Sequence, residues 1–473
     1  MPVIMHRSQK VAVALLVSCL GLLAKPSAAQ ALQQGSPGPS MNAKDRSALQ
    51  SAVRDYQNGN ARGAEPALKT LLQRYPHNAE VLESLGLIYA EQRQILKALP
   101  LLESACSAQP SSPIVFENLG LTYLKLGRNA DALRVLRQAA VLEPDARHEA
   151  MIGNALMGLK RYGEAAQAFQ VVSQADPADQ DTRYQWALAL FQSGELVQAA
   201  QRIQSVAIGD SSAQEQALLG DIHERQGRYL EAVNDLRSAA RMNPSQENVN
   251  ALGLELLRHS LYDEALANYS SGLSRYPSSS RMMFGLGLSK YGTNDFTGAA
   301  GVFSGLLRAE PRNHVYLEML ERSCSLNMSD PGTSCDAIIL YAKAHPNDVT
   351  AETAAAATVM QRTNDRQDLT LARTFLQRAL AANSQSVEAN YLMGAWYQQR
   401  LLWQESLPFL RRAVQIDPGY GKAHYRLARA LFRLGDHEDG DYEIGRNAEC
   451  TRKEQQKADR ETTSLQLFLA AMH

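Results

Sequence analysis

One pattern of apolar and small residues recurs along the chain about every 34 residues. In residues 79–112 the pattern occupies Leu82, Leu85, Gly86, Tyr89, Ala98, Leu102 and Ala105. Residues 113–146 carry similar residues at the same offsets, namely Phe116, Leu119, Gly120, Tyr123, Ala132, Leu136 and Ala139. Spacings of three and four place such residues on one face of a helix. Each period is therefore predicted to form two helices, and each helix buries one face.

A proline marks the end of most periods. The prolines are Pro76, Pro110, Pro144, Pro177, Pro244, Pro277, Pro311, Pro346 and Pro418, with gaps of 34, 34, 33, 67, 33, 34, 35 and 72 residues. The two long gaps are each close to two periods, and Ser211 and Ser384 stand where the missing prolines would fall. Because the residue before a proline is disfavoured in the α region, each proline is expected to stop a second helix.

These residues resemble the tetratricopeptide repeat, W-x2-L-G-x2-Y followed by A-x3-F and a closing proline. Further clear copies occupy 213–245 and 387–420, weaker ones 45–78, 146–179, 180–212, 246–279 and 280–313, and degenerate ones 314–350 and 351–386. The resemblance implies an all-α, right-handed superhelical solenoid of about 11 tandem helix-turn-helix repeats. A single hairpin cannot bury both faces, so stacked neighbours would supply the stability.

Small residues are expected to set the distance between the two helices of a repeat. The glycine of the first helix is predicted to let the second helix approach closely, with an alanine of the second helix as the facing small residue. A second set of glycines, Gly127, Gly194, Gly227 and Gly435, falls between paired helices. A left-handed residue there would end the first helix.

The two ends of the chain depart from the repeat. Residues 45–313 predict an array of about eight repeats, and residues 387–435 predict one more repeat and the first helix of a last unit. Residues 436–473 predict a long charged helix without a closing proline. Such a helix suits a solvating cap, which solenoids need at an exposed end, and a binding tail is the alternative.

Residues 1–29 have the features of an export signal. Basic residues precede an apolar run of 14 residues, Val11–Ala24, and small residues follow near Ala29. The segment around Cys19 resembles a lipobox, so an outer-membrane lipoprotein is an alternative to a periplasmic or secreted protein. An uncleaved anchor helix is a third interpretation. Residues 30–44, rich in Gln, Gly, Ser and Pro, predict a flexible linker.

Charge and motifs give no sign of an enzyme or a nucleic-acid-binding protein. The chain has 48 basic and 49 acidic residues, and this balance provides no basic footprint for nucleic acid. No phosphate-binding loop, zinc-protease helix or nucleophile elbow occurs. The sequence therefore predicts no catalytic residue, no cofactor and no metal site. Membrane contact is expected only through the signal or a lipid at Cys19.

Two cysteines flank a loop in the most degenerate repeat. Cys324 is placed near the end of a first helix, and Cys335 at the start of a second. An oxidising compartment would allow a disulfide across this turn, and the alternative is two unpaired thiols. The bond would compensate for a repeat whose core residues are poor.

The family resemblance implies where a partner would bind. In tetratricopeptide proteins the first helices line a concave groove, and the corresponding residues here include Tyr184, Leu188, Phe191, Phe284, Leu288 and Tyr391. The expected function is a non-enzymatic scaffold in the bacterial cell envelope that holds peptides or helices of other proteins. The alternatives are a non-catalytic subunit of an envelope enzyme and a structural self-assembler.

Overall fold

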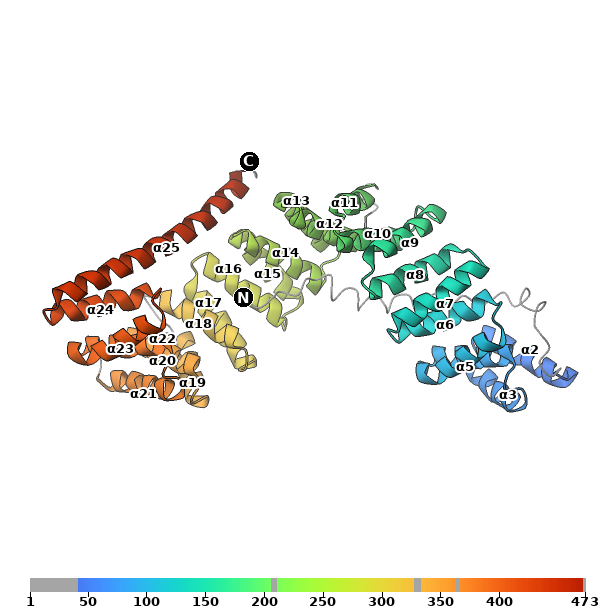
Figure 1. Cartoon of the computed structure of the whole chain (residues 1–473), viewed down its shortest axis with the longest axis horizontal. Helices are drawn as coiled ribbons and strands as arrows, with labels where there is room; N and C mark the ends of the chain where they lie inside the picture. Colours follow the sequence, from blue (N-terminus) through green and yellow to red (C-terminus); the bar gives the residue numbers. More distant parts are fainter. Residues whose placement is uncertain (1–40, 206–210, 327–332, 363–365, 471–473) are drawn as a thin grey trace. The chain divides into compact units, whose positions relative to one another are not determined.

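The computed structural model of the protein describes residues 41–205, 211–326, 333–362 and 366–470. Within these ranges the chain is helical, with no strand, and consecutive helices form antiparallel pairs (Figure 1). The all-α class predicted from the sequence is confirmed. The export signal, its Cys19 and most of the linker lie outside the described residues.

The chain divides into two compact units, and the first ends at Gln226. Its helices are α2 (Ala43–Gln57), α3 (Ala61–Arg74), α4 (Ala79–Glu91), α5 (Ile95–Ala108), α6 (Pro113–Lys125), α7 (Asn129–Leu142), α8 (Ala146–Gly158), α9 (Tyr162–Ala175), α10 (Gln180–Ser193), α11 (Leu196–Gln204) and α12 (Ala213–Arg225). Helix α2 begins two residues earlier than the predicted array start at residue 45, because the Asn42 side chain caps it by accepting a hydrogen bond from the Asp45 amide.

The second unit starts at Gly227. Its helices are α13 (Tyr229–Met242), α14 (Gln246–Arg258), α15 (Tyr262–Arg275), α16 (Ser280–Gly292), α17 (Phe296–Ala309), α18 (His314–Leu326), α19 (Asp336–Ala344), α20 (Val349–Arg362), α21 (Arg366–Ala382), α22 (Val387–Gln399), α23 (Trp403–Ile416), α24 (Gly421–Arg433) and α25 (His437–Ala470). A short 3-10 helix, Thr333–Cys335, precedes α19. The helix boundaries follow the sequence period, since each marker proline lies two residues after the end of a second helix.

The first-helix glycines allow close packing inside each hairpin, but their partner differs from the sequence expectation. A Cβ atom added to Gly86 would lie 2.9 Å from Leu102, and one added to Gly287 would lie 2.6 Å from Phe303. The residue that fills the space is the large side chain 16 positions later, rather than the alanine of the second helix. That alanine is itself buried, as Ala98 and Ala299 show at 0% exposure.

Turn glycines adopt the conformation that the sequence predicts. Gly127 has a φ of 69° and Gly194 a φ of 92°, in the left-handed region that glycine tolerates best. At the same place in other repeats, Arg93 and Lys160 adopt φ values of 60° and 59°. A left-handed residue therefore ends the first helix even where the sequence supplies no glycine.

Candidate functional site

The predicted groove residues of α10 are covered rather than open. Tyr184, Leu188 and Phe191 are 7%, 3% and 4% exposed and belong to the hydrophobic core of the first unit. The guanidinium of Arg225 on α12 lies 4.8 Å from the centre of the Phe191 ring and donates a hydrogen bond to the Phe191 carbonyl at 3.3 Å. The neighbouring first helix thus packs over these side chains, so the structure does not present them as a binding surface.

The predicted residues on α16 pack partly into the second unit. Phe284 and Leu288 are half-buried against its core. The Phe284 ring lies 5.8 Å from the Phe303 ring and 5.6 Å from the Tyr316 ring, measured between centres. These contacts hold Phe284 in an aromatic cluster and leave only part of its surface for a partner.

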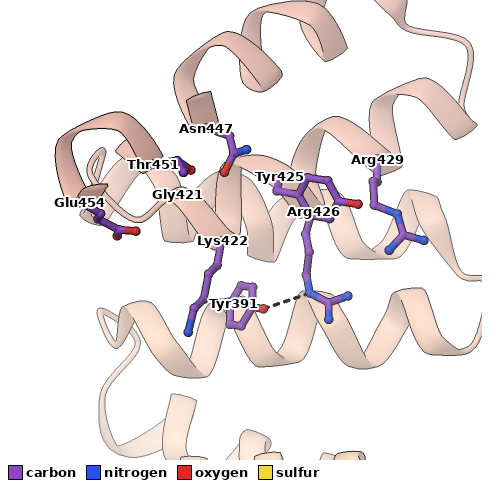
Figure 2. A pocket seen from close by; sticks show the side chains of 9 residues that line it. All are labelled: Tyr391, Gly421, Lys422, Tyr425, Arg426, Arg429, Asn447, Thr451 and Glu454. Carbon is purple, nitrogen blue, oxygen red and sulfur yellow. Dashed lines mark hydrogen bonds between the residues drawn. The ribbon is translucent and has the colours of Figure 1, made fainter. Parts of the chain in front are cut away.

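Tyr391 differs because it lines a hollow. This hollow, of about 350 Å³, lies between α22, α24 and α25 (Figure 2). Helix α22 contributes Tyr391, α25 contributes Asn447, Thr451 and Glu454, and α24 contributes Gly421, Lys422, Tyr425, Arg426 and Arg429. Among the six predicted groove residues, only Tyr391 lines this hollow.

Arg426 and Tyr391 join the first helices of two neighbouring repeats. Arg426 donates a hydrogen bond from Nε to the Tyr391 hydroxyl at 3.2 Å and one from Nη1 to Gln398 Oε1 at 3.3 Å. Figure 2 shows Tyr391 between the side chains of Lys422 and Arg426, which reach toward it from α24. The Tyr391 ring also meets Tyr420 edge-on, with centres 5.3 Å apart. These contacts fix one wall of the hollow.

The exposed side chains of α24 are cationic and aromatic. Lys422, Tyr425, Arg429 and Arg433 are all exposed, and their spacings of three and four place them on one face of the helix. Arg429 and Arg433 lie over the Trp403 ring of α23, at 6.0 and 5.6 Å from its centre. We call Lys422, Tyr425, Arg426, Arg429 and Arg433 the α24 face.

None of the four cations of the α24 face forms an ion pair with a carboxylate among the described side chains. Some other arginines of the second unit do form ion pairs, as Arg378 does with Glu352 at 3.0 Å and Arg446 with Glu449 at 2.6 Å. Helix α24 itself contains no acidic residue. Within the part of the chain that the structure describes, carboxylates therefore lie near this positive charge, as Glu454 in the hollow and Glu321 near Lys422, but none pairs with it directly.

Acidic residues occupy the first helices before α24. The Tyr420 hydroxyl donates a 2.5 Å hydrogen bond to Glu388 Oε2 on α22, and burial together with this carboxylate raises the pKa of Tyr420. On α18, burial and the charges of Glu388 and Glu318 raise the pKa of Glu321 to about 7. The sign of the charge along the first helices therefore changes between α22 and α24.

Helix α25 both covers α24 and borders the hollow. Cys450 is buried beside Gly421, and His424 of α24 contacts the Glu443 carboxylate through Nδ1. Farther along the same helix, Thr451 and Glu454 line the hollow. The part of α25 around Glu443 and Cys450 thus packs on α24, as a cap would. The turn that follows contributes the polar side chains of Thr451 and Glu454 to the candidate site.

The structure joins Cys324 to Cys335 by a disulfide between α18 and the 3-10 turn before α19. Both cysteines are buried, and their Cα atoms are 6.0 Å apart. Helix α19 has nine residues, so the bond fastens a hairpin whose second helix is short.

No group of three or more His, Cys, Asp or Glu side chains able to hold a metal occurs among the described residues. In the same residues, no helix has the length and apolar character needed to cross a membrane.

The α24 face was not identified from the sequence, although a signal was present. Lys422, Arg426, Arg429 and Arg433 recur at spacings of four, three and four in a segment without acid. Over the whole chain the 48 basic and 49 acidic residues nearly balance, and this balance hides the local excess of positive charge. Only the stacking order of the helices shows that the basic residues gather at one end of the second unit.

Comparisons with known proteins identify the repeat. Tetratricopeptide repeat models match residues 49–113, 118–180 and 250–314, and a further model of the same repeat matches residues 216–246. No curated protein matches the chain at a significant level.

Solved structures that resemble the chain share little sequence with it. A tetratricopeptide repeat protein from Parabacteroides merdae is 16% identical, with 60% of this chain and 99% of that chain covered and a TM-score of 0.38. PilF of Pseudomonas aeruginosa is 18% identical, with 43% and 94% covered and a TM-score of 0.35. The Naa15/Naa10 structure with HypK is 15% identical, with 85% and 68% covered and a TM-score of 0.35. The described residues thus form an all-α solenoid of helical hairpins, of which residues 49–113, 118–180, 216–246 and 250–314 match the tetratricopeptide repeat.

Proposed function

We propose that this protein is a non-catalytic scaffold of the bacterial cell envelope, which binds a segment of a partner protein at the hollow between α22, α24 and α25. The observation that carries the proposal is the α24 face, where exposed aromatic and cationic side chains border a hollow. Tyrosine and arginine are the residue types that contribute most to binding at protein interfaces. Tetratricopeptide repeats supply the rigid support that such a surface needs.

Affinity capture of the tagged mature chain from its own cell envelope, after gentle crosslinking, tests this proposal. A reproducible partner should be recovered with the intact chain and lost with Tyr425→Ala combined with Arg429→Ala. The control is Arg411→Ala, because Arg411 is exposed on the second helix α23 and lies outside the hollow. Recovery of the chain alone, or a partner that the α24 variant retains, would contradict the proposal.

The envelope location rests on residues 1–29 and has its own test. Intact mass measurement of the protein from its native cells should show a mature chain that starts near Gln30, or a lipid-modified chain that starts at Cys19. A chain that retains Met1 in the cytoplasm would contradict export.

A role as an accessory subunit of an envelope enzyme is the second candidate. The same capture experiment distinguishes it, because the partner would then be a hydrolase or transferase and the purified chain alone would show no turnover.

A further inference from the structure

The α24 face carries a short row of positive charges. Seven residues separate Lys422 from Arg429 and four separate Arg429 from Arg433. At 1.5 Å rise per residue, these separations correspond to about 10 Å and about 6 Å along the helix. Charged groups in an extended peptide repeat every two residues, about 7 Å, on one side of the backbone. The step from Arg429 to Arg433 is therefore close to the repeat of alternate side chains in an extended peptide, whereas the step from Lys422 to Arg429 is longer than one such repeat.

The groups that Arg426 and Arg429 contact are rings and neutral side chains, while Lys422 lies near enough to the Glu321 carboxylate of α18 to act on its pKa. Arg429 lies 6.0 Å from the centres of both the Trp403 and Tyr425 rings, and Arg426 bonds a tyrosine hydroxyl and a glutamine oxygen. Such contacts orient a guanidinium and leave its charge unneutralised. Like charges on one helix face repel one another, and an anionic ligand would relieve that repulsion.

The chemistry of the row favours carboxylates. A guanidinium presents paired N–H donors that match the two oxygens of a carboxylate or a phosphate. A protein that binds nucleic acid typically contacts many phosphates, on the order of six to ten in one binding site. Here the exposed row holds three cations, and the Glu454 carboxylate borders the same hollow. A short acidic protein segment fits this number of charges better than a continuous polyanion.

We propose that the occupant of the hollow is an acidic segment of the partner protein, whose carboxylates pair with Lys422, Arg429 and Arg433 while an adjoining side chain packs against Tyr425. This inference rests on the proposed function and specifies the ligand class at that site. It differs from the carboxylate clamp of lysines and asparagines that some tetratricopeptide proteins use, because the cations here are mainly arginines held beside aromatic rings.

The test is fluorescence anisotropy with the full mature chain and a labelled ten-residue peptide of alternating glutamate and alanine. The peptide should bind, its affinity should fall steeply as salt rises, and a matched lysine–alanine peptide should not bind. Reversing two charges with Arg429→Glu and Arg433→Glu should weaken binding at least tenfold. Arg411→Glu, the matched control on α23, should leave binding within twofold, and circular dichroism should show that both variants remain helical.

Three results would overturn the inference. They are equal binding of the lysine peptide, binding that survives the double reversal, and tighter binding of a single-stranded oligonucleotide that the same reversal abolishes. If capture from the envelope yields a partner that depends on the α24 face and the glutamate peptide does not bind, the scaffold function stands and the acidic ligand is wrong. If capture yields no partner, the scaffold function itself fails.

Discussion

The hairpin of α16 and α17 contains two glycines that should respond in opposite directions to the same substitution. Gly287 lies in the first helix against Phe303, which is fully buried, and an added Cβ would stand 2.6 Å from the Phe303 ring. Gly305 lies in the exposed side of α17, with no atom within 4 Å of an added Cβ. Both are helical, so the backbone contribution of alanine is the same at each position.

The magnitudes follow from these two environments. Alanine in place of glycine in a helix interior stabilises by about 0.5–1 kcal/mol. Gly305→Ala should show this gain undiminished. At Gly287 the ring must move by about 1 Å to reach an ordinary contact distance, and overpacking of this kind costs about 1–3 kcal/mol. Gly287→Ala should therefore destabilise the hairpin by up to about 2.5 kcal/mol, with a middle value of about 1 kcal/mol, after the helical gain is subtracted.

Native-state hydrogen exchange, read by mass spectrometry on peptides from α16 and α17, measures this local effect. The stability of a solenoid is a sum of local contributions, so a global melting curve would dilute the difference. Protection should fall by about tenfold in Gly287→Ala and rise in Gly305→Ala, while α6 and α7 in the first unit should not change. If both substitutions raised protection, the close approach of Phe303 would not restrict the glycine, and the reasoning on the repeat glycines would be refuted.

Three further predictions concern buried groups of the second unit. The Tyr269 hydroxyl is buried and has no hydrogen-bond partner among the described residues, so Tyr269→Phe should stabilise α15 by about 1 kcal/mol in hydrogen exchange, and a loss of protection would indicate a hidden partner. Because the folded state raises the pKa of Glu321 to about 7, it binds that proton more tightly than the unfolded chain, and stability should fall by about 2 kcal/mol from pH 5 to pH 8. Urea titrations of Glu321→Gln should lack this decline, and those of Glu405→Gln, an exposed residue that does not act on Glu321, should keep it; an unchanged slope in Glu321→Gln would exclude Glu321 as the source. Reduction of the bond between Cys324 and Cys335, which are 11 positions apart, opens a short loop, so it should lower the free energy of local unfolding of α18 and α19 by about 3 kcal/mol at most, and Cys324→Ser with Cys335→Ser should remove the effect of reductant.

The sequence predicted the helical hairpins closely, because their boundaries depend on local chemistry. A proline ends a helix whatever packs around it, and a left-handed turn residue is recognised where it is glycine, as at Gly127. Where Lys160 takes the same conformation, its residue type does not indicate a turn, and only the repeat period predicts one. Local rules and the repeat period together therefore predicted the fold.

The candidate site was harder to predict because exposure depends on neighbours. The face of α10 that carries Tyr184 and Phe191 is apolar, as a groove would be, but Arg225 and α12 cover it. Part of that contact is a buried ion pair, Arg183 to Glu215 at 2.6 Å, between residues 32 positions apart. Because the two residues lie in neighbouring repeats, the sequence of one repeat does not show that they pair. Burial across repeats, rather than the pattern within one, decides which first helices stay open.

The rule that a glycine meets the large residue 16 positions later has a consequence for exchanging parts of the chain. Gly86 and Leu102 belong to the same hairpin, and so do Gly394 and Leu410. A segment cut out between two marker prolines would therefore contain both the glycine and the large residue that it contacts. Tyr269 breaks this independence. Its ring also occupies the space beside Gly285 in the next hairpin, so a crossover at Pro277 would separate the ring from one of its two glycines. The hairpins of α14–α15 and α16–α17 should therefore be transferred as a single piece.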